Sequence, residues 1–159
     1  THFSSPNDAF NYLDEIALTF AWDDSGWING FTLAPYATLA LEVGGGQATG
    51  DDRGLFLGLG IEPSHTFEAT PIGDLTLSLP IEVGFSLDDY YQDDDGDNKA
   101  FGYLTIGLGA SVPLPFPSGF GAWSLSAGVD YLILGSSNKA LNDGDSAEWI
   151  IHAGISVEF

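Results

Sequence analysis

The chain has 159 residues, enough for one domain, and a formal net charge of −20, because 23 acidic residues stand against three basic ones, Arg53, Lys99 and Lys139. This charge argues against nucleic acid as a partner, since phosphate recognition needs a basic surface. Hydrophobic residues make up 44% of the chain, so it is unlike a disordered acidic sequence. Cysteine is absent, which excludes a disulfide framework and a thiolate metal site.

Apolar residues alternate with small or polar ones along most of the chain, and this period of two predicts β-strands. The alternation is clearest over 75–87, where every odd position is apolar. In chain order the seven predicted strands lie near 12–22, 30–43, 54–68, 75–87, 104–114, 123–133 and 151–159. No segment has a convincing helical period, and no apolar stretch reaches the roughly 18 residues of a transmembrane helix. We therefore expect one all-β domain over residues 1–159, without helices.

Strand length and the polar face distinguish a membrane barrel from a soluble sandwich or barrel. A strand of about 13 residues, tilted by about 40°, covers on the order of 30 Å, close to the apolar height of an outer-membrane barrel. Strands of soluble proteins usually have about 5–6 residues. The face opposite the apolar one carries glycine, serine, threonine, alanine and isolated carboxylates. These small polar residues suit a confined lumen better than an open surface.

The aromatic residues fall in two groups at opposite strand ends, with aliphatic residues between them. One group is Trp22, Trp27, Phe31, Phe116, Phe120, Trp123 and Phe159, and the other is Tyr12, Tyr90, Tyr91, Phe101, Tyr103 and Trp149. Two aromatic girdles around an aliphatic belt are typical of a protein that crosses two membrane interfaces. We therefore predict an antiparallel up-and-down transmembrane β-barrel, and a soluble secreted β-barrel or sandwich is the alternative.

The last residues of the chain resemble the C-terminal assembly signal of bacterial outer-membrane β-barrel proteins. The signal has a polar residue, a glycine two positions later, a hydrophobic residue three positions after that, and a terminal aromatic residue. His152, Gly154, Val157 and Phe159 stand at these positions, although Val157 is aliphatic where the family often has an aromatic residue. The resemblance implies a location in the bacterial outer membrane, in contact with membrane lipid.

The resemblance also implies an orientation, because the family has a periplasmic C-terminus, short periplasmic turns and longer outer loops. The turns at 23–30, 70–74 and 113–122 would then be periplasmic. The longer and more acidic loops 44–54, 88–100 and 135–147 would face outward.

This orientation places residues 1–11 outside the cell, as an outer loop or the remnant of an upstream strand. Three accounts are open: missing upstream strands, an extra strand within 1–10, or a parallel closure of the first and seventh strands. We expect the first of these, with the chain as the C-terminal part of a larger, even-stranded barrel.

Several acidic residues and one tyrosine are predicted to meet on the inner face. If each hairpin is symmetric about its turn, Glu62 lies opposite Glu82, and Tyr36 faces Glu62, with Glu15 nearby. No lysine or arginine stands on a predicted strand. Adjacent carboxylates without a cationic partner must stay hydrated, bind a cation or share a proton. We therefore expect a polar, cation-preferring lumen, although these acids could also serve only to keep a narrow interior polar.

Three further features carry weaker predictions. Asp130 and His152 are predicted to lie opposite each other, as a structural hydrogen bond on the lumen wall. The run from Asp93 to Asp97 does not have the spacing of an EF-hand, yet Asp93, Asp95 and Asp97 could hold a divalent ion such as Ca²⁺ loosely. Pro35 and Pro80 fall inside predicted strands, where each removes a ladder donor, so we expect bulges or a sheet edge there.

The function predicted first is a porin-like passive channel that needs no cofactor. The first alternative is a non-conducting structural or interaction barrel whose acidic outer loops bind divalent cations or a partner, such as an oligomeric copy or other envelope proteins. The second alternative is the soluble secreted fold. An enzyme is not expected, because no nucleophile stands beside a candidate base.

Overall fold

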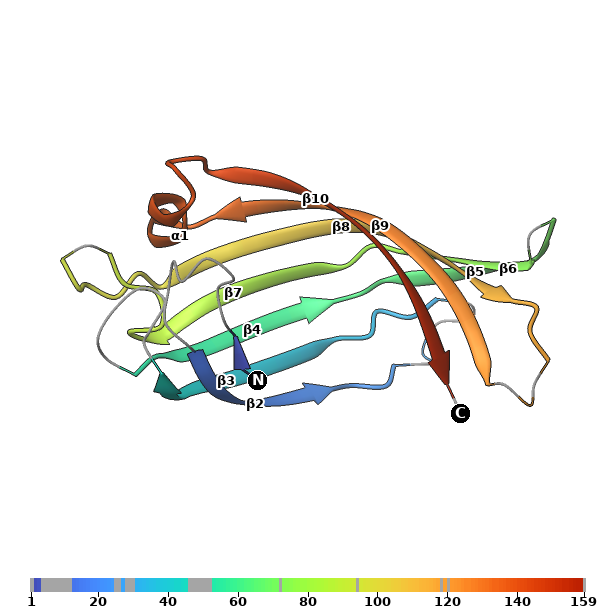
Figure 1. Cartoon of the computed structure of the whole chain (residues 1–159), viewed down its shortest axis with the longest axis horizontal. Coiled ribbons are helices and arrows are strands. Elements are labelled where there is room, and N and C mark those ends of the chain that lie inside the picture. Colours follow the sequence, from blue (N-terminus) through green and yellow to red (C-terminus); the bar gives the residue numbers. More distant parts are fainter. Residues whose placement is uncertain are drawn as a thin grey trace.

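The computed structural model of the chain describes residues 2–3, 13–24, 27, 31–45, 53–71, 73–93, 95–117, 119 and 121–158. Its elements are β1 (His2–Phe3), β2 (Leu13–Ala21), β3 (Tyr36–Gly45), β4 (Leu55–Ile61), β5 (Ser64–Thr70), β6 (Gly73–Ser78), β7 (Ile81–Asp88), β8 (Phe101–Leu114), β9 (Ala122–Leu134), α1 (Ser136–Leu141) and β10 (Ala147–Glu158). Within these residues all the strands belong to one curved antiparallel sheet (Figure 1). The predicted all-β class is confirmed, and the described sheet is not closed.

Seven long strands form the wall, as the alternation predicts, because two of them are divided into two segments each. β4 and β5 are separated only by Glu62 and Pro63, and β6 and β7 only by Leu79 and Pro80. The pairing continues in one register across both interruptions, from Ile61 opposite Ile81 to Ser64 opposite Ser78. The segments 55–70 and 73–88 are therefore one long hairpin with a break near its middle.

Pro80 interrupts a strand and Pro35 precedes one, and no register shift occurs at either residue, so the predicted bulges are wrong. Pro80 has no N–H to donate, but its carbonyl accepts from Gly107 N at 2.7 Å, and the ladder resumes on either side. Pro63 acts in the same way toward Leu79 N, at 2.8 Å. Pro35 stands just before β3, and its carbonyl accepts from Trp22 N at 2.9 Å. The register shifts occur elsewhere, as at Asp14/Glu15 of β2.

A buried carboxylate holds the chain where it enters β3. Asp24 is only 4% exposed, and its two oxygens accept hydrogen bonds from Leu33 N at 2.7 Å and Ala34 N at 2.9 Å. Ala34 has a positive φ of 44°, which is an unfavourable conformation for a residue with a Cβ. The two charge-assisted bonds offset that strain and let the chain turn into β3.

The two faces of the sheet differ sharply. The even-numbered residues of β8 lie on the same face as the odd-numbered residues of β9 and β10, and this face carries most of the aliphatic side chains of the three strands. On this apolar face large side chains are exposed, with Leu18 and Leu108 at 57% and Ile151 at 85%. The buried core residues Ala40, Phe56 and Tyr91 lie on the opposite, polar face. Among the described residues, no second layer packs on the apolar face.

One short helix was not predicted. α1 lies in the acidic loop between β9 and β10, and the hydroxyl of Ser137 donates to Gln92 O at 2.5 Å, which ties this loop to the loop after β7. No helix in the described part of the chain has the length and apolar character needed to cross a membrane. Of the N-terminal residues 1–11, His2 and Phe3 form β1, and the others lie outside the described residues.

Candidate functional site

The centre of the polar face is a carboxylate that binds two tyrosine hydroxyls. Glu82 of β7 accepts from Tyr36 Oη of β3 on Oε2 at 2.5 Å, and from Tyr103 Oη of β8 on Oε1. Tyr36 is two strands away from Glu82, and β4 lies between them. The arrangement fixes the Glu82 carboxylate between two donors, and no ion pair with a basic side chain is found for it among the described residues.

Glycines on neighbouring strands make this reach possible. Gly60 of β4 stands opposite both Tyr36 and Glu82 in the two ladders, and a Cβ at this glycine would overlap the Tyr36 ring. Gly84 stands opposite Tyr103, whose ring would lie 2.5 Å from an added Cβ. Each tyrosine therefore lies flat across a glycine, which covers the bare backbone and orients the hydroxyl toward Glu82.

We predict that Gly60→Ala separates Tyr36 from Glu82 and destabilises the fold. The added methyl group must displace the ring, and overpacking of this kind typically costs about 1–3 kcal/mol. Gly119→Ala is the control, because a Cβ at Gly119 would meet nothing within 4 Å. Urea unfolding of both variants in detergent measures the difference, and an equal, small effect of both would contradict the packing described here.

The four predicted lumen residues do not all meet. Tyr36 and Glu82 do, but Gly60, not Glu62, is the residue opposite both. Glu62 stands two positions further on, exposed, at the break between β4 and β5. Glu15 pairs with Glu42, whereas Ala21 is the residue opposite Tyr36 in the β2–β3 ladder, so the register does not place Glu15 beside Tyr36 as predicted.

Glu15 belongs to a second carboxylate pair near the acidic loops. It stands opposite Glu42 in the β2–β3 ladder, and its Oε2 accepts from Tyr90 Oη at 3.1 Å. Glu42 is 3% exposed, and its Oε2 accepts from Gly54 N at 2.8 Å. Sequence reasoning missed Glu42, although its even number places it on the same face of β3 as Tyr36.

Four aromatic rings fill the polar face between these carboxylates. Phe56 lies 5.1 Å from Tyr90 and 6.3 Å from both Tyr91 and Tyr103, measured between ring centroids. The three tyrosines were predicted to be girdle residues, and this is wrong, because they pack around Phe56 on the polar face. Burial raises the pKa of the Tyr90 and Tyr91 hydroxyls above the usual value, so both stay protonated. We name Phe56, Tyr90, Tyr91 and Tyr103 the aromatic cluster.

Other aromatic side chains remain exposed at the strand ends. Trp22, Trp27 and Phe116 are exposed at the turn end, and Phe101 and Trp149 at the loop end. Tyr131 was not predicted in the loop-end group, and its ring lies 4.8 Å from that of Trp149. Phe31 and Trp123 are half-buried, while Tyr12, Phe120 and Phe159 lie outside the described residues.

The loop after β7 is anchored at its base and carries the predicted metal ligands. Ser86 Oγ accepts from Tyr90 N at 2.9 Å and Tyr91 N at 3.2 Å, which turns both tyrosines inward. Asp93 binds Lys99 Nζ at 2.6 Å and also accepts from the amides of Asp95 and Asp97. Lys99 keeps the pKa of the Asp93 carboxyl below its usual range. In the described part of the run, the Asp93 carboxylate is therefore already bound by Lys99 and by two backbone amides instead of being a free metal ligand.

Asp130 and His152 are in contact, although not directly opposite each other. His152 stands opposite Gly128, and Asp130 opposite Ile150, so the two side chains meet diagonally, with His152 Nε2 3.4 Å from Asp130 Oδ2. Each lies over a glycine of the next strand, Asp130 over Gly107 and His152 over Gly128. No serine or other nucleophile contacts the pair among the interactions observed, which suits a structural contact on the wall.

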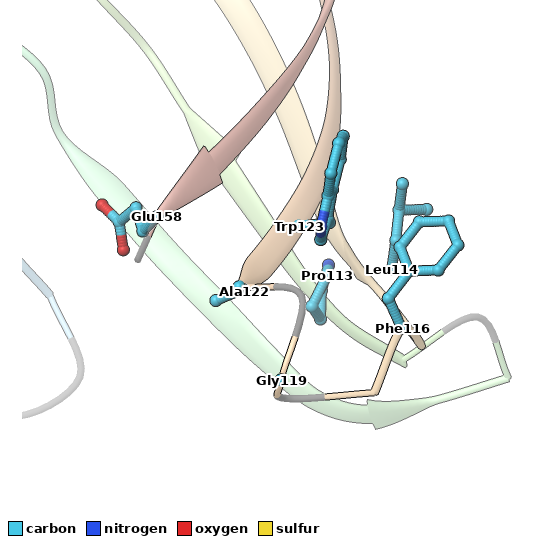
Figure 2. Close-up of a pocket in the computed structure, with 8 residues that line it drawn as sticks. Pro113, Leu114, Phe116, Gly119, Ala122, Trp123 and Glu158 are labelled. Carbon is cyan, nitrogen blue, oxygen red and sulfur yellow. The ribbon is translucent and has the colours of Figure 1, made fainter.

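A hollow of about 510 Å³ opens at the turn between β8 and β9. Its lining residues are Pro113, Leu114, Phe116, Gly119, Gly121, Ala122, Trp123 and Glu158. Figure 2 shows Phe116 and Trp123 on one side of this hollow and Glu158 on the other, pointing away from them. The Phe116 and Trp123 rings pack edge to face at 5.6 Å. The hollow is an aromatic turn end and does not bring together groups for chemistry.

Three of the four residues that resemble an assembly signal lie on β10, namely His152, Gly154 and Val157, and Phe159 lies outside the described residues. Asp94 of the acidic run also lies outside them. Comparisons with protein-family models, with curated proteins and with solved structures give no match for this chain.

Proposed function

We propose that this chain forms the wall of a membrane-embedded β-barrel of the bacterial outer-membrane type, and that its polar face lines a porin-like passive channel. One observation carries the proposal: a single-layer sheet exposes its large aliphatic side chains on one face and holds glycines, hydroxyls and carboxylates on the other. Outer-membrane barrels have this apolar-out, polar-in alternation. A soluble sandwich would instead cover the apolar face with a second sheet.

Lipid is the partner that the apolar face fits. Soluble monomers rarely expose contiguous apolar patches larger than a few hundred Å². Here exposed aliphatic residues occur on β2, β3, β4, β8, β9 and β10. Exposed tryptophans at both strand ends, Trp22 and Trp149, suit the two interfaces of a bilayer.

The polar face favours cations. Glu82, Glu15 and Glu42 point to this face, and no lysine or arginine stands on a described strand. A ring of carboxylates in a confined aqueous path attracts cations and repels anions. The proposed constriction is the level of Tyr36, Glu82 and Tyr103.

Reconstitution in planar bilayers tests this function. We expect single-channel steps with a preference for K⁺ over Cl⁻, and we expect Glu82→Gln to reduce that preference severalfold, because it removes the carboxylate at the constriction. Asp97→Asn is the control, since this side chain is 78% exposed in a loop. Anion preference, or no conductance under any condition, would overturn the channel proposal.

A specific observation favours a second candidate, a non-conducting structural or interaction barrel. The aromatic cluster and the two tied loops occupy the loop end of the polar face. If these groups close the interior, the barrel carries no current, and its acidic outer loops are the surface that binds divalent cations or a partner. This candidate predicts silent bilayers together with a binding or assembly defect when Asp93, Asp95 and Asp97 are replaced by asparagine.

A further inference from the structure

The sheet has two margins whose strands lack a full set of neighbours. β10 pairs with β9 along twelve residues, and no described strand pairs with its other side. On the opposite margin, β1 pairs with β2 only at Asp14 and Leu13, so Ile16–Ala21 has no described strand on that side. About half of the N–H and C=O groups of an edge strand point away from its one neighbour. In hydrocarbon each such group costs several kcal/mol unless it is paired.

The side chains of both margins are apolar enough to lie at membrane depth. Ile16 and Phe20 of β2 are 67% and 65% exposed, and Ile151 of β10 is 85% exposed. These values exceed those of Leu39 on the neighbouring β3 and Leu125 on β9, at 41% and 44%. Leu108 on β8, which has partners on both sides, is also 57% exposed, so the unpaired backbone of the two margins, and not side-chain exposure, is what calls for a further strand.

Strand direction limits what can fill the gap. β2 and β10 both begin at the end that carries α1 and run to the opposite end (Figure 1). If β10 paired with β2, that seam would be parallel. A second copy in the same membrane orientation would also meet β10 with its own β2 in parallel. Only an odd number of added strands keeps every neighbour antiparallel, as all the described pairs are.

β1 already has the required direction and position. His2 pairs with Asp14 and Phe3 with Leu13, antiparallel, at the loop end of β2. In a longer strand that ends with His2 and Phe3, the residues before His2 would pair with residues 16–21 of β2, because the two strands are antiparallel. β2 is the only described strand that pairs with β1, so the other side of β1 has no described partner.

From this we infer that β1 is the end of a further long strand, supplied by residues on the amino-terminal side of Thr1, and that an odd number of strands from that segment closes the sheet between β2 and β10. The inference rests on the barrel proposed above, but not on whether that barrel conducts. It identifies the chain's own preceding segment as the partner of both margins.

Site-specific photo-crosslinking tests the inference on the natural-length protein folded in detergent. p-Benzoylphenylalanine replaces Ile155 on β10 or Leu18 on β2, and mass spectrometry identifies the crosslinked peptides. We expect both positions to react with peptides that precede Thr1, within one molecule. Leu125 is the control, because β9 has β8 and β10 on its two sides and should react with peptides of those strands.

Three outcomes would overturn the inference. A crosslink from Ile155 to the 13–21 peptide of the same molecule would show parallel self-closure, and the same crosslink between molecules would show closure by a second copy. Crosslinks from Ile155 only to β9 and from Leu18 only to β3, the strands already paired with them, would show that the margins have no further strand partner. Bilayer conductance is measured independently, so a silent barrel with the expected crosslinks would remove the channel and keep the closure.

Discussion

Leu108→Arg is expected to destabilise the folded protein by about 2–4 kcal/mol, the cost of an arginine at the middle of the lipid-facing surface of a membrane barrel. Leu108 stands at the middle of β8 and is 57% exposed on the apolar face. In water, a charged residue at so exposed a position would change stability by only about 0.5 kcal/mol. Urea unfolding in lipid vesicles measures the effect, and its size therefore reports the medium that this face contacts.

Leu87→Arg is the matched control for this variant. Leu87 is 50% exposed on the same face but lies next to the last residue of β7, at the loop end. Near a membrane interface the cost of arginine falls to about 0–1 kcal/mol. A much larger loss of stability for Leu108→Arg than for Leu87→Arg supports a lipid-facing surface. Small, equal losses would favour the soluble alternative, in which neither leucine has a depth in a membrane.

The strands could be predicted from sequence because a period of two constrains a residue's face so strongly. A slip of one residue would move every side chain to the other face, so the alternation over 75–87 determines both the strand and the face of Glu82. The turns were located to within a few residues for the same reason. α1 was missed because six residues between two glycine-containing turns carry no amphipathic period, and its position depends on the contact of Ser137 with the neighbouring loop.

The site was harder to predict, since a hairpin's register depends on the position of its turn. The predicted pair, Glu62 opposite Glu82, assumes a hairpin centred on residue 72, but the observed pairs are centred on residue 71. A shift of the centre by one residue changes the partner of each residue by two positions. Gly60 therefore replaces Glu62 opposite Glu82. The shift keeps every residue on its predicted face, which is why Tyr36 and Glu82 still meet. Tyr90 and Tyr91 follow no strand period, because Ser86 turns their loop inward.

Phe56→Ala is expected to have the largest effect on stability of any substitution on the polar face. Phe56 is 9% exposed and contacts three tyrosine rings, so its removal leaves a cavity bounded by Tyr90, Tyr91 and Tyr103. Truncation of a buried phenylalanine costs about 3–5 kcal/mol. Phe67→Ala is the control, because Phe67 is 45% exposed, and it should cost less than about 1 kcal/mol. Equal costs would contradict a packed aromatic cluster.

The same variant separates the two proposed functions. If ions pass the aromatic cluster, removal of the Phe56 ring widens the path, and the conductance of Phe56→Ala exceeds that of the unaltered protein. If the cluster closes the interior, the unaltered protein is silent, and Phe56→Ala acquires a current. Unchanged conductance in a correctly folded variant would place the ion path away from the cluster and leave Tyr36, Glu82 and Tyr103 as its narrowest level. Gly119→Ala, which alters an open position at the turn end, should change neither stability nor current.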